Sequence, residues 1–382
     1  MKRLIPAAIL ALLLLPPAVS ALAQQPYATS AQRALQWLQC TQQQANGQIG
    51  SGNGNPVARS SEVALGLAAA GQPASAMHSG SVSLAGYLTT ATSTDVGTNG
   101  ELLLARASQT DAGPAATVAA QLQASKTTSG ATAGEYGGDI FSDALAILGL
   151  RADGQSVGAD AVTYLKGQQK SDGGWSYDNA DAYGTDSNTT ALVLQALIAS
   201  GVALDDPAVG NGFTYMKSVF GQGGFGNTPG AGPDANSDEL AIQAILAGDR
   251  QSDAAWATML DQALSYLSGQ QVASGADAGA IANSYSKLLA TTEAPSAFLL
   301  RPMTVVGLAE TKVALLSCPA TAAASATPTP SPRPTPAATA PTTARLAQTG
   351  SGPRSGQLLA GLAMLVAGIG ILVRRLQRAP GR

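Results

Sequence analysis

The sequence contains few of the side chains that most often carry out chemistry in proteins. Its 382 residues include one histidine, His78, and two cysteines, and aromatic residues make up only 4% of the chain. With so few rings, little aromatic surface remains for stacking on ligands. His78 stands alone in a segment rich in alanine and serine, which favours an ordinary surface position for it.

Positive charge is scarce over most of the chain. All 24 acidic residues lie between Tyr27 and Cys318, where we count 12 lysines and arginines, so this region carries a formal charge of −12. Binding to nucleic acid depends on a basic face that releases counterions from phosphates. The composition therefore argues against a nucleic-acid partner.

The N-terminus has the pattern of a secretory signal peptide over residues 1–23. Lys2 and Arg3 precede an apolar run from Leu4 to Val19, and small residues then form a cleavage site before Gln24. We expect the mature protein to leave the cytoplasm.

The C-terminus carries three further segments. Residues 319–345 are rich in Pro, Thr and Ala, which predicts an extended stalk. A motif follows at 346–350, then an uncharged predicted transmembrane segment at 355–373 and a basic cytoplasmic tail at 374–382.

This C-terminal order resembles the sorting signals of Gram-positive surface proteins, with LAxTG in place of LPxTG. The resemblance implies that a sortase cuts between Thr349 and Gly350 and links Thr349 to cell-wall peptidoglycan. Ala347 stands where proline is usual, so simple anchoring in the membrane is the alternative. Either way, we expect a cell-surface location with the main domain outside.

Two cysteines in an exported chain are expected to pair. Cys40 lies near the start of the main domain, 27–318, and Cys318 lies at its end, so a disulfide would join the two ends. Cys40 and Gln43 are also three residues apart, as in internal thioesters, although the glycine-rich context of that motif is absent.

An aromatic or polar residue followed by Leu or Met recurs six times, at intervals of 34 to 51 residues. A period of this size is typical of a repeat fold. The pairs are Trp37-Leu38, Tyr87-Leu88, Gln121-Leu122, Tyr164-Leu165, Tyr215-Met216 and Tyr266-Leu267.

Between these pairs, glycine-rich loops lead into apolar segments, which predict a second helix in each repeat. The clearest are 61–70, 101–107, 142–150, 189–200 and 238–247. Ser142, Asp186 with Ser187, and Asn236 with Ser237 are predicted to cap them, and Gly71, Gly149 and Gly201 to end them. The predicted fold is all-α: an α/α toroid of about six helix pairs, followed by the stalk and one transmembrane helix.

One repeat has a recognisable spacing. Tyr164, Leu165, Gln169, Gly173 and Trp175 fit the aromatic-Leu-x3-Gln-x3-Gly-x-Trp pattern, and Tyr266, Leu267, Gln271 and Gly275 match it as far as the glycine. This resembles the QW repeat of squalene cyclases, within the terpenoid cyclase and protein prenyltransferase α/α-toroid superfamily. In that family the Gln and Trp brace neighbouring repeats, so the resemblance implies a fold but no activity.

The family's catalytic groups are missing. Squalene-hopene-type cyclases use the middle Asp of a D-x-D-D-T-A segment as their acid, and Asn188 stands at that position. Prenyltransferases hold zinc with Asp, Cys and His, which one histidine and two paired cysteines do not supply. The sequence therefore favours a protein that is not an enzyme, with no catalytic residues, no metal and no certain cofactor.

The segment 185–192 resembles a sequence motif of the inner helices of cobalamin-transport proteins of the intrinsic-factor type, which are secreted toroids. Cobalamin is thus one candidate ligand, although the lid domain of that family has no counterpart here.

Acidic and aromatic residues gather in the loops that precede the second helices, which places them on one rim of the ring. They either cap the helices or hold a small-molecule or glycan ligand, or Ca²⁺. The candidate binding residues are Trp175, Tyr177, Asp178, Asp181, Tyr183, Asp186, Asn188, Phe225, Asp234 and Asp238, with Glu239 beside them.

The predicted function is ligand binding by a non-catalytic toroid at the cell surface. The alternatives are a divergent terpene cyclase, with a deep apolar cavity, a cobalamin-binding protein, and a structural spacer or adhesin with a filled centre.

Overall fold

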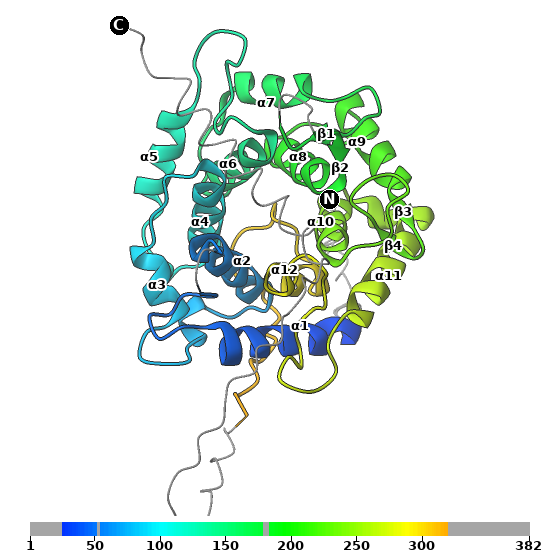
Figure 1. The fold of residues 1–382 in the computed structure, drawn as a ribbon. Helices are drawn as coiled ribbons and strands as arrows, with labels where there is room; N and C mark the ends of the chain where they lie inside the picture. The colour runs from blue at the N-terminus through cyan, green and yellow to red at the C-terminus, as the bar shows by residue number, and fades with distance from the viewer. Residues whose placement is uncertain (1–24, 52–53, 179–182, 320–382) are drawn as a thin grey trace, which may run out of the picture. The chain divides into compact units, whose positions relative to one another are not determined.

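The structure is a computed structural model that describes residues 25–51, 54–178 and 183–319. These residues form two concentric rings of helices (Figure 1). The predicted signal peptide, the stalk beyond Pro319, the sorting motif and the transmembrane segment lie outside the described residues. Within the described residues, no helix is long and apolar enough to cross a membrane.

The inner ring contains one helix from each repeat. Each inner helix packs against the next, and α12 packs against α2, which closes the ring. Most residues of these helices are buried, as their apolar sequences predict. The inner helices are α2 (Pro56–Ala69), α4 (Val96–Ser108), α6 (Ile140–Ala152), α8 (Ser187–Ala199), α10 (Ala235–Ala247) and α12 (Lys287–Phe298).

The outer ring carries the recurring residue pairs found in the sequence. The Leu or Met of every pair is buried against the inner ring, from Leu38 to Leu267. The outer helices are α1 (Gln25–Trp37), α3 (Leu84–Thr90), α5 (Ala116–Ser125), α7 (Gly158–Gly167), α9 (Pro207–Ser218) and α11 (Ala254–Gly269). The predicted all-helical toroid of helix pairs is therefore confirmed for this part of the chain.

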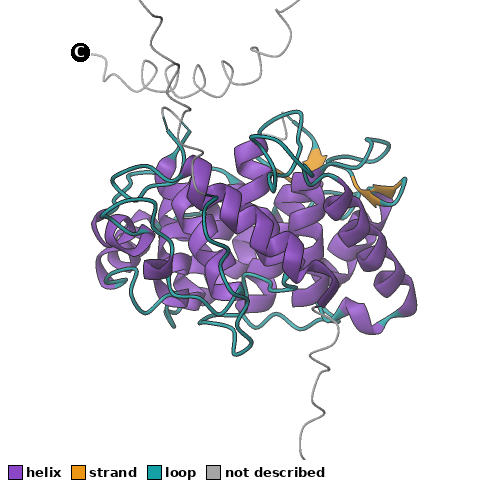
Figure 2. Ribbon diagram, turned by 90° about the horizontal axis from the view of Figure 1, so that it is seen from below, coloured by secondary structure: helices purple, strands orange, loops and turns teal. Residues whose placement is uncertain are grey.

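Short elements complete the fold. Two hairpins pair β1 (Trp175–Ser176) with β2 (Thr185–Asp186), and β3 (Phe220–Gly221) with β4 (Gly224–Phe225). A π-helical turn, η1 (Leu38–Gln42), extends α1, and two short turns are η2 (Ala74–Ala76) and η3 (Arg250–Ser252). Figure 2 shows both hairpins at one end of the unit, where inner helices begin.

The inner helices begin earlier than the sequence predicted. Asp139 rather than Ser142 caps α6, and Asp234 rather than Asn236 or Ser237 caps α10, while Asp186 caps α8 as expected. In each case the aspartate carboxylate accepts hydrogen bonds from N–H groups of the first turn, which otherwise have no partner.

Gly149 does not end α6, contrary to prediction, because it lies inside the helix where α6 crosses α4. It faces Gly100 of α4, and a Cβ atom at either glycine would overlap the backbone of the opposite helix. The two glycines allow the helices to approach more closely than any larger residues would.

A repeated hydrogen bond joins five of the inner helices to the loop that precedes each of them. A buried loop residue donates its backbone N–H to a side-chain oxygen in the first two turns of that helix. The pairs are Ile49 with Ser60 at 2.9 Å, Tyr136 with Asp143 at 2.7 Å, Trp175 with Thr190 at 2.9 Å, Phe225 with Asp238 at 2.6 Å and Ile281 with Thr291 at 2.9 Å.

The glutamines of the QW-like pattern join neighbouring repeats. Gln169 Nε2 donates to Gly173 O at 2.9 Å in its own loop and to Ala208 O at 2.8 Å in α9. Gln271 Nε2 likewise donates to Gly279 O at 2.9 Å and to Ser30 O at 2.8 Å in α1, which links the last repeat to the first.

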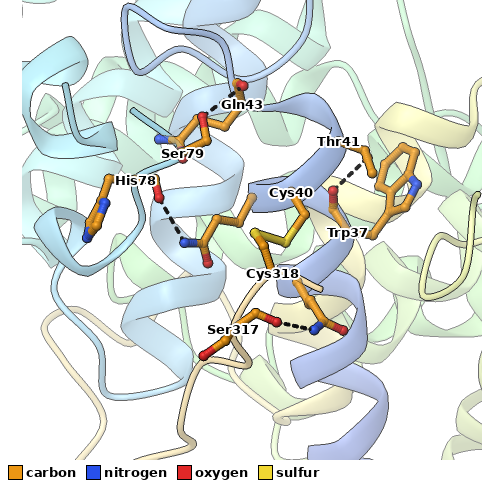
Figure 3. The surroundings of a disulfide bond; sticks show 10 residues. Trp37, Cys40, Thr41, Gln43, His78, Ser79, Ser317 and Cys318 are labelled. Atoms are coloured by element: carbon orange, nitrogen blue, oxygen red, sulfur yellow. Dashed lines mark hydrogen bonds between the residues drawn. A yellow bond between two sulfur atoms is a disulfide. The ribbon is translucent and has the colours of Figure 1, made fainter. Parts of the chain in front are cut away.

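The segment from Leu299 to Cys318 crosses the end of the ring where the inner helices finish. Met303 N donates to Gln195 Oε1 of α8 at 2.9 Å, and Ala309 N donates to Ala68 O of α2 at 2.8 Å. The segment then follows α1 to Cys318, which forms a disulfide with Cys40 with the Cα atoms 5.5 Å apart (Figure 3). This bond excludes a thioester at Cys40 in the structure.

The loop-to-helix hydrogen bonds make a testable contribution to stability. We expect Thr190→Val to lower the free energy of unfolding by about 1 to 3 kcal/mol, because it leaves the buried Trp175 N–H without an acceptor. Urea denaturation of the full chain measures this. Thr163→Val, the same substitution at an exposed position of α7, is the control and should change little. Equal effects of the two substitutions would contradict the assigned role.

Candidate functional site

One mouth of the ring collects the N-termini of the inner helices. Four of these helices begin at an aspartate, and each carboxylate accepts a backbone N–H of the first turn: Asp95, Asp139, Asp186 and Asp234. Asn55 caps α2 and its side chain also donates to Thr98 Oγ1 of α4 at 2.8 Å. The acidic rim is therefore explained by capping and by the positive ends of the helix dipoles.

Aromatic side chains stand at the same mouth. The exposed fractions of Tyr177 and Tyr183 are 44% and 60%, and their ring centroids are 6.3 Å apart. Tyr177 also packs on Phe141 of α6 at 5.8 Å. Partial burial and the nearby Asp139 carboxylate raise the pKa of Tyr177 to about 12, so its hydroxyl stays protonated at neutral pH.

Three predicted binding residues lie elsewhere. Trp175 and Phe225 are fully buried, and Trp175 Nε1 donates to Leu165 O at 2.7 Å. Asp238 is also fully buried, where it accepts from Phe225 N. The interpretation of these three as ligand contacts at the rim is wrong, because Trp175 and Phe225 lie in the buried strands β1 and β4, and Asp238 of α10 faces the loop whose N–H it accepts.

The other predicted residues that the structure describes lie at or near the mouth. Tyr177, Tyr183, Asp186 and Asp234 take the positions described above, and Asp178 is half-buried beside Tyr177. Asn188 is half-buried in the first turn of α8, where it accepts from Ser187 Oγ at 3.3 Å. Asp181 lies outside the described residues.

A group of charged residues lies deeper than the caps, and the sequence reasoning missed most of it. We call it the axial cluster: Arg59 and Glu62 of α2, Glu101 of α4, Glu239 of α10 and Glu293 of α12. These helices are consecutive around the ring, and the charges of Glu101 on α4 and Glu293 on α12 both act on Arg59 of α2. Side chains from both neighbours of α2 therefore meet, which places the cluster on the inward faces. A single glutamate within each of several apolar helices was the signal in the sequence.

Hydrogen bonds connect part of the axial cluster. Arg59 Nη1 lies 2.7 Å from Glu62 Oε2, which also accepts from Thr292 Oγ1. Asn236 Nδ2 of α10 donates to Glu293 Oε2. The Arg59 side chain keeps 17% of its surface exposed, and Glu101 and Glu293 are half-buried, so solvent reaches part of the cluster.

Other carboxyl oxygens of the cluster have no donor. Neither oxygen of Glu239 accepts a hydrogen bond from an N–H or hydroxyl group, and its side chain is fully buried. Glu101 Oε2 is likewise without a partner. The Glu239 carboxyl lies against that of Glu293, so a hydrogen bond between the two requires a proton on one of them.

Burial makes these carboxyls weak acids. It raises the pKa of Glu62, against the opposing effect of Arg59. Burial and the neighbouring Glu62 hold the pKa of Glu101 well above its usual range, and burial with Glu293 does the same for Glu239. Burial and the charge of Glu62 raise the pKa of Glu293 to about 8. With a pKa of about 8, Glu293 therefore keeps its proton at neutral pH.

A small cavity separates the axial cluster from the segment that crosses the ring. Its volume is about 20 Å³, and Glu62, Ser108, Gln243, Glu293 and Met303 are among its lining residues. This is room for about one water molecule, which the unpartnered Ser108 Oγ and Gln243 Oε1 would bind. This cavity is far too small for a terpenoid.

No arrangement typical of a metal site was found. In the part of the chain that the structure describes, no group of three or more His, Cys, Asp or Glu side chains is arranged to hold a metal ion. Calcium at the rim and cobalamin stay predictions.

Solved structures share this arrangement of helices. One is the type II terpene cyclase MstE from Scytonema, without ligand. Its match covers 73% of this chain and 98% of the cyclase chain, with a TM-score of 0.53 and 16% sequence identity. Another is a variant of that enzyme in complex with its substrate, geranylgeranyl dihydroxybenzoate. Its match covers 74% of this chain and 99% of the variant's chain, with a TM-score of 0.52 and 17% sequence identity. The chain has a terpenoid cyclase-like α/α-toroid fold.

This likeness concerns the fold of the toroid alone. No protein-family model matches the sequence, and no curated protein matches it. The activity of this toroid must be argued from its own residues.

The raised pKa of Glu293 predicts how the stability of the toroid depends on pH. Between pH 4.5 and about 8, folded Glu293 keeps a proton that the unfolded chain releases, so the free energy of unfolding falls as the pH rises through this range. The groups that face Glu293 are Arg59 and Glu62 from α2, Glu101 from α4, and Glu239 and Asn236 from α10.

We therefore expect Glu293→Gln to reduce this pH dependence, because glutamine does not titrate. Thermal unfolding at pH 5 and pH 8 measures the effect. Glu310→Gln, at an exposed position, is the matched control and should retain the dependence of the original chain. If Glu293→Gln and Glu310→Gln behave alike, the assignment of a buried proton to Glu293 is wrong.

Proposed function

We propose that this chain is an exported protein, held at the cell surface by its C-terminal segments, whose toroid binds a ligand at its mouth or centre without catalysing a reaction. The axial cluster is the observation that carries the binding part of this proposal. The export and anchoring parts rest on the sequence of the two ends.

The polar centre supports a polar ligand. Glutamates on four inner helices face the axis, and one carboxyl oxygen of Glu101 has no hydrogen-bond partner. A hydrocarbon placed against such groups would leave them unsolvated, which costs free energy. A ligand with hydrogen-bonding groups would satisfy them, and the exposed Tyr177 and Tyr183 rings would contact it at the mouth.

Asn188 supports the absence of catalysis. An amide stands at the position where the squalene-hopene-type cyclases carry their acid, and an amide does not protonate an alkene. In this toroid Asn188 is half-buried and accepts a hydrogen bond from Ser187 Oγ. A role in packing at the start of α8 explains its presence.

A cyclase-like enzyme is the second candidate, and one observation favours it. Glu239 and Glu293 form a buried pair with raised pKa values, so one carboxylic acid persists in the ring at neutral pH. An acid held in this form is able to donate a proton to a substrate.

Binding and catalysis can be separated with the purified full chain. We expect at least one polar ligand class, tested with oligosaccharides, cobalamin, CaCl₂ and amines, to raise the midpoint of thermal unfolding, because a ligand that binds only the folded state stabilises it. The shift should be lost in Glu239→Gln and kept in Glu310→Gln. Incubation with geranylgeranyl dihydroxybenzoate should leave that compound unchanged.

Two results would contradict the proposal. A cyclised product that depends on Glu239 or Glu293 would favour the enzyme. No shift with any of the ligands would favour a structural spacer.

Anchoring is tested in the producing cell. We expect Thr349→Ala to move the protein from the fraction released only by peptidoglycan digestion to the fraction extracted by detergent, because the residue that would be joined to the wall is changed. Immunoblots of the two fractions measure this. If detergent already extracts the original chain, a plain membrane anchor replaces the sortase in this proposal.

A further inference from the structure

The segment from Leu299 to Cys318, which we call the strap, covers the end of the ring where the inner helices finish. Its Met303 lines the small cavity together with Glu62 and Glu293. If the strap were lifted, water would reach these carboxyls and the buried ends of the inner helices. The closed state of this end of the ring therefore depends on how the strap is held.

Hydrogen bonds hold much of the strap, while few of its side chains are buried. After Pro302, every strap residue keeps at least a partly exposed side chain. Val313 N donates to Ala70 O at 2.9 Å, and Val313 O accepts from Gln72 Nε2 at 2.9 Å. A segment held in this way loses its hydrogen bonds one after another when it is pulled from one end, because only the outermost bond is under tension at any moment.

The last part of the strap runs alongside α1 in the same direction. Gln32 Nε2 donates to Ala314 O at 2.9 Å, and Gln36 Nε2 donates to Ser317 O at 2.6 Å, next to the disulfide (Figure 3). From the first of these bonds to the disulfide, α1 rises about 12 Å and an extended strap advances about 13 Å. The two spans match, so the strap follows α1 in an extended form up to the disulfide.

The disulfide lies where the toroid ends in the sequence. Cys318 is followed by Pro319 and then by the predicted stalk. If the C-terminal segments anchor the protein, a pull on the stalk reaches the toroid first at Cys318. The disulfide offers this pull a covalent route to Cys40, at the end of α1, beside a strap that has only hydrogen bonds to resist it.

Helix α1 is firmly attached to the rest of the ring. It packs against α12 of the last repeat. Arg33 Nη2 donates to Val272 O at 2.8 Å, and Ser30 O accepts from Gln271 Nε2 at 2.8 Å. A pull that arrives at α1 is shared by these bonds and by the packing of a whole helix at the same time.

We infer that the Cys40–Cys318 disulfide is a mechanical staple, which carries tension from the anchored C-terminus to α1 and keeps the strap closed over the ring. This inference rests on the anchoring part of the proposed function, because the anchor is the source of the tension. It assigns the bond a role under load in addition to its contribution to the stability of the resting fold.

Stretching single molecules of the full chain tests the inference. One handle is attached without cysteine chemistry at the exposed Thr163 of α7, and the other at the C-terminus. With both Cys40→Ser and Cys318→Ser in place, we expect the strap to detach before the ring opens. The gain in length is at most about 70 Å, the extended length of the strap. The oxidised original chain should show no such step.

Two controls accompany this measurement. Chemical reduction of the folded original chain should produce the same step, which removes any dependence on folding of the double variant. Gln36→Ala deletes the hydrogen bond beside the disulfide, so it should lower the force of the step in the reduced chain and leave the oxidised chain unchanged. Gln123→Ala, which deletes a bond to Ser156 O on the far side of the ring, should change neither.

A strap-length step in the oxidised chain would overturn the inference, because the tension would then pass along the strap. A reduced chain that opens without this step would also overturn it, since the strap would require no staple.

Failure of the anchoring proposal is visible in a separate measurement. If the original chain leaves the producing cell with neither detergent nor peptidoglycan digestion, the tension has no source and the role of the staple in the cell is overturned together with the anchor. If the chain is anchored but the stretching results differ from those expected, only the staple is overturned.

Discussion

Closure of the inner ring is the constraint on which the rest of this structure depends. Inner helices as apolar as α6 and α8 are stable in water only when both flanks and the outer side are covered. Each helix covers the next, and contact between α12 and α2 supplies the last cover. The seam is reinforced by Gln271, which reaches α1, and by the Cys40–Cys318 disulfide.

The closed ring also creates the site. Its inner helices all begin at the same mouth, so residues at similar depths in different helices face a common axis. Aspartates cap four of them, while the glutamates further along meet one another beside Arg59. This toroid, whose fold is similar to that of a terpene cyclase, thereby has a polar, acidic centre.

The sequence predicted the outer ring well because its signal is local. The Tyr164 to Trp175 spacing describes one helix end, one turn and one buried ring, and the structure confirms each of them. Helix starts were predicted three residues late in α6 because Asp139 and Ser142 are both good capping residues, and only the path of the preceding loop selects between them. Gly149 was misassigned because its partner, Gly100, is 49 residues away in the sequence.

By itself, the sequence determined that this chain is a helical repeat protein with an acidic main domain and without the squalene-cyclase acid, because period, composition and residue identity are properties of short segments. Only the tertiary structure decided which acidic residues meet. Asp238 turned outward to a loop N–H, and its neighbour Glu239 turned inward to Glu293. Successive residues of a helix point about 100° apart, so direction within the closed ring, rather than residue type, separates a structural carboxylate from a candidate binding group.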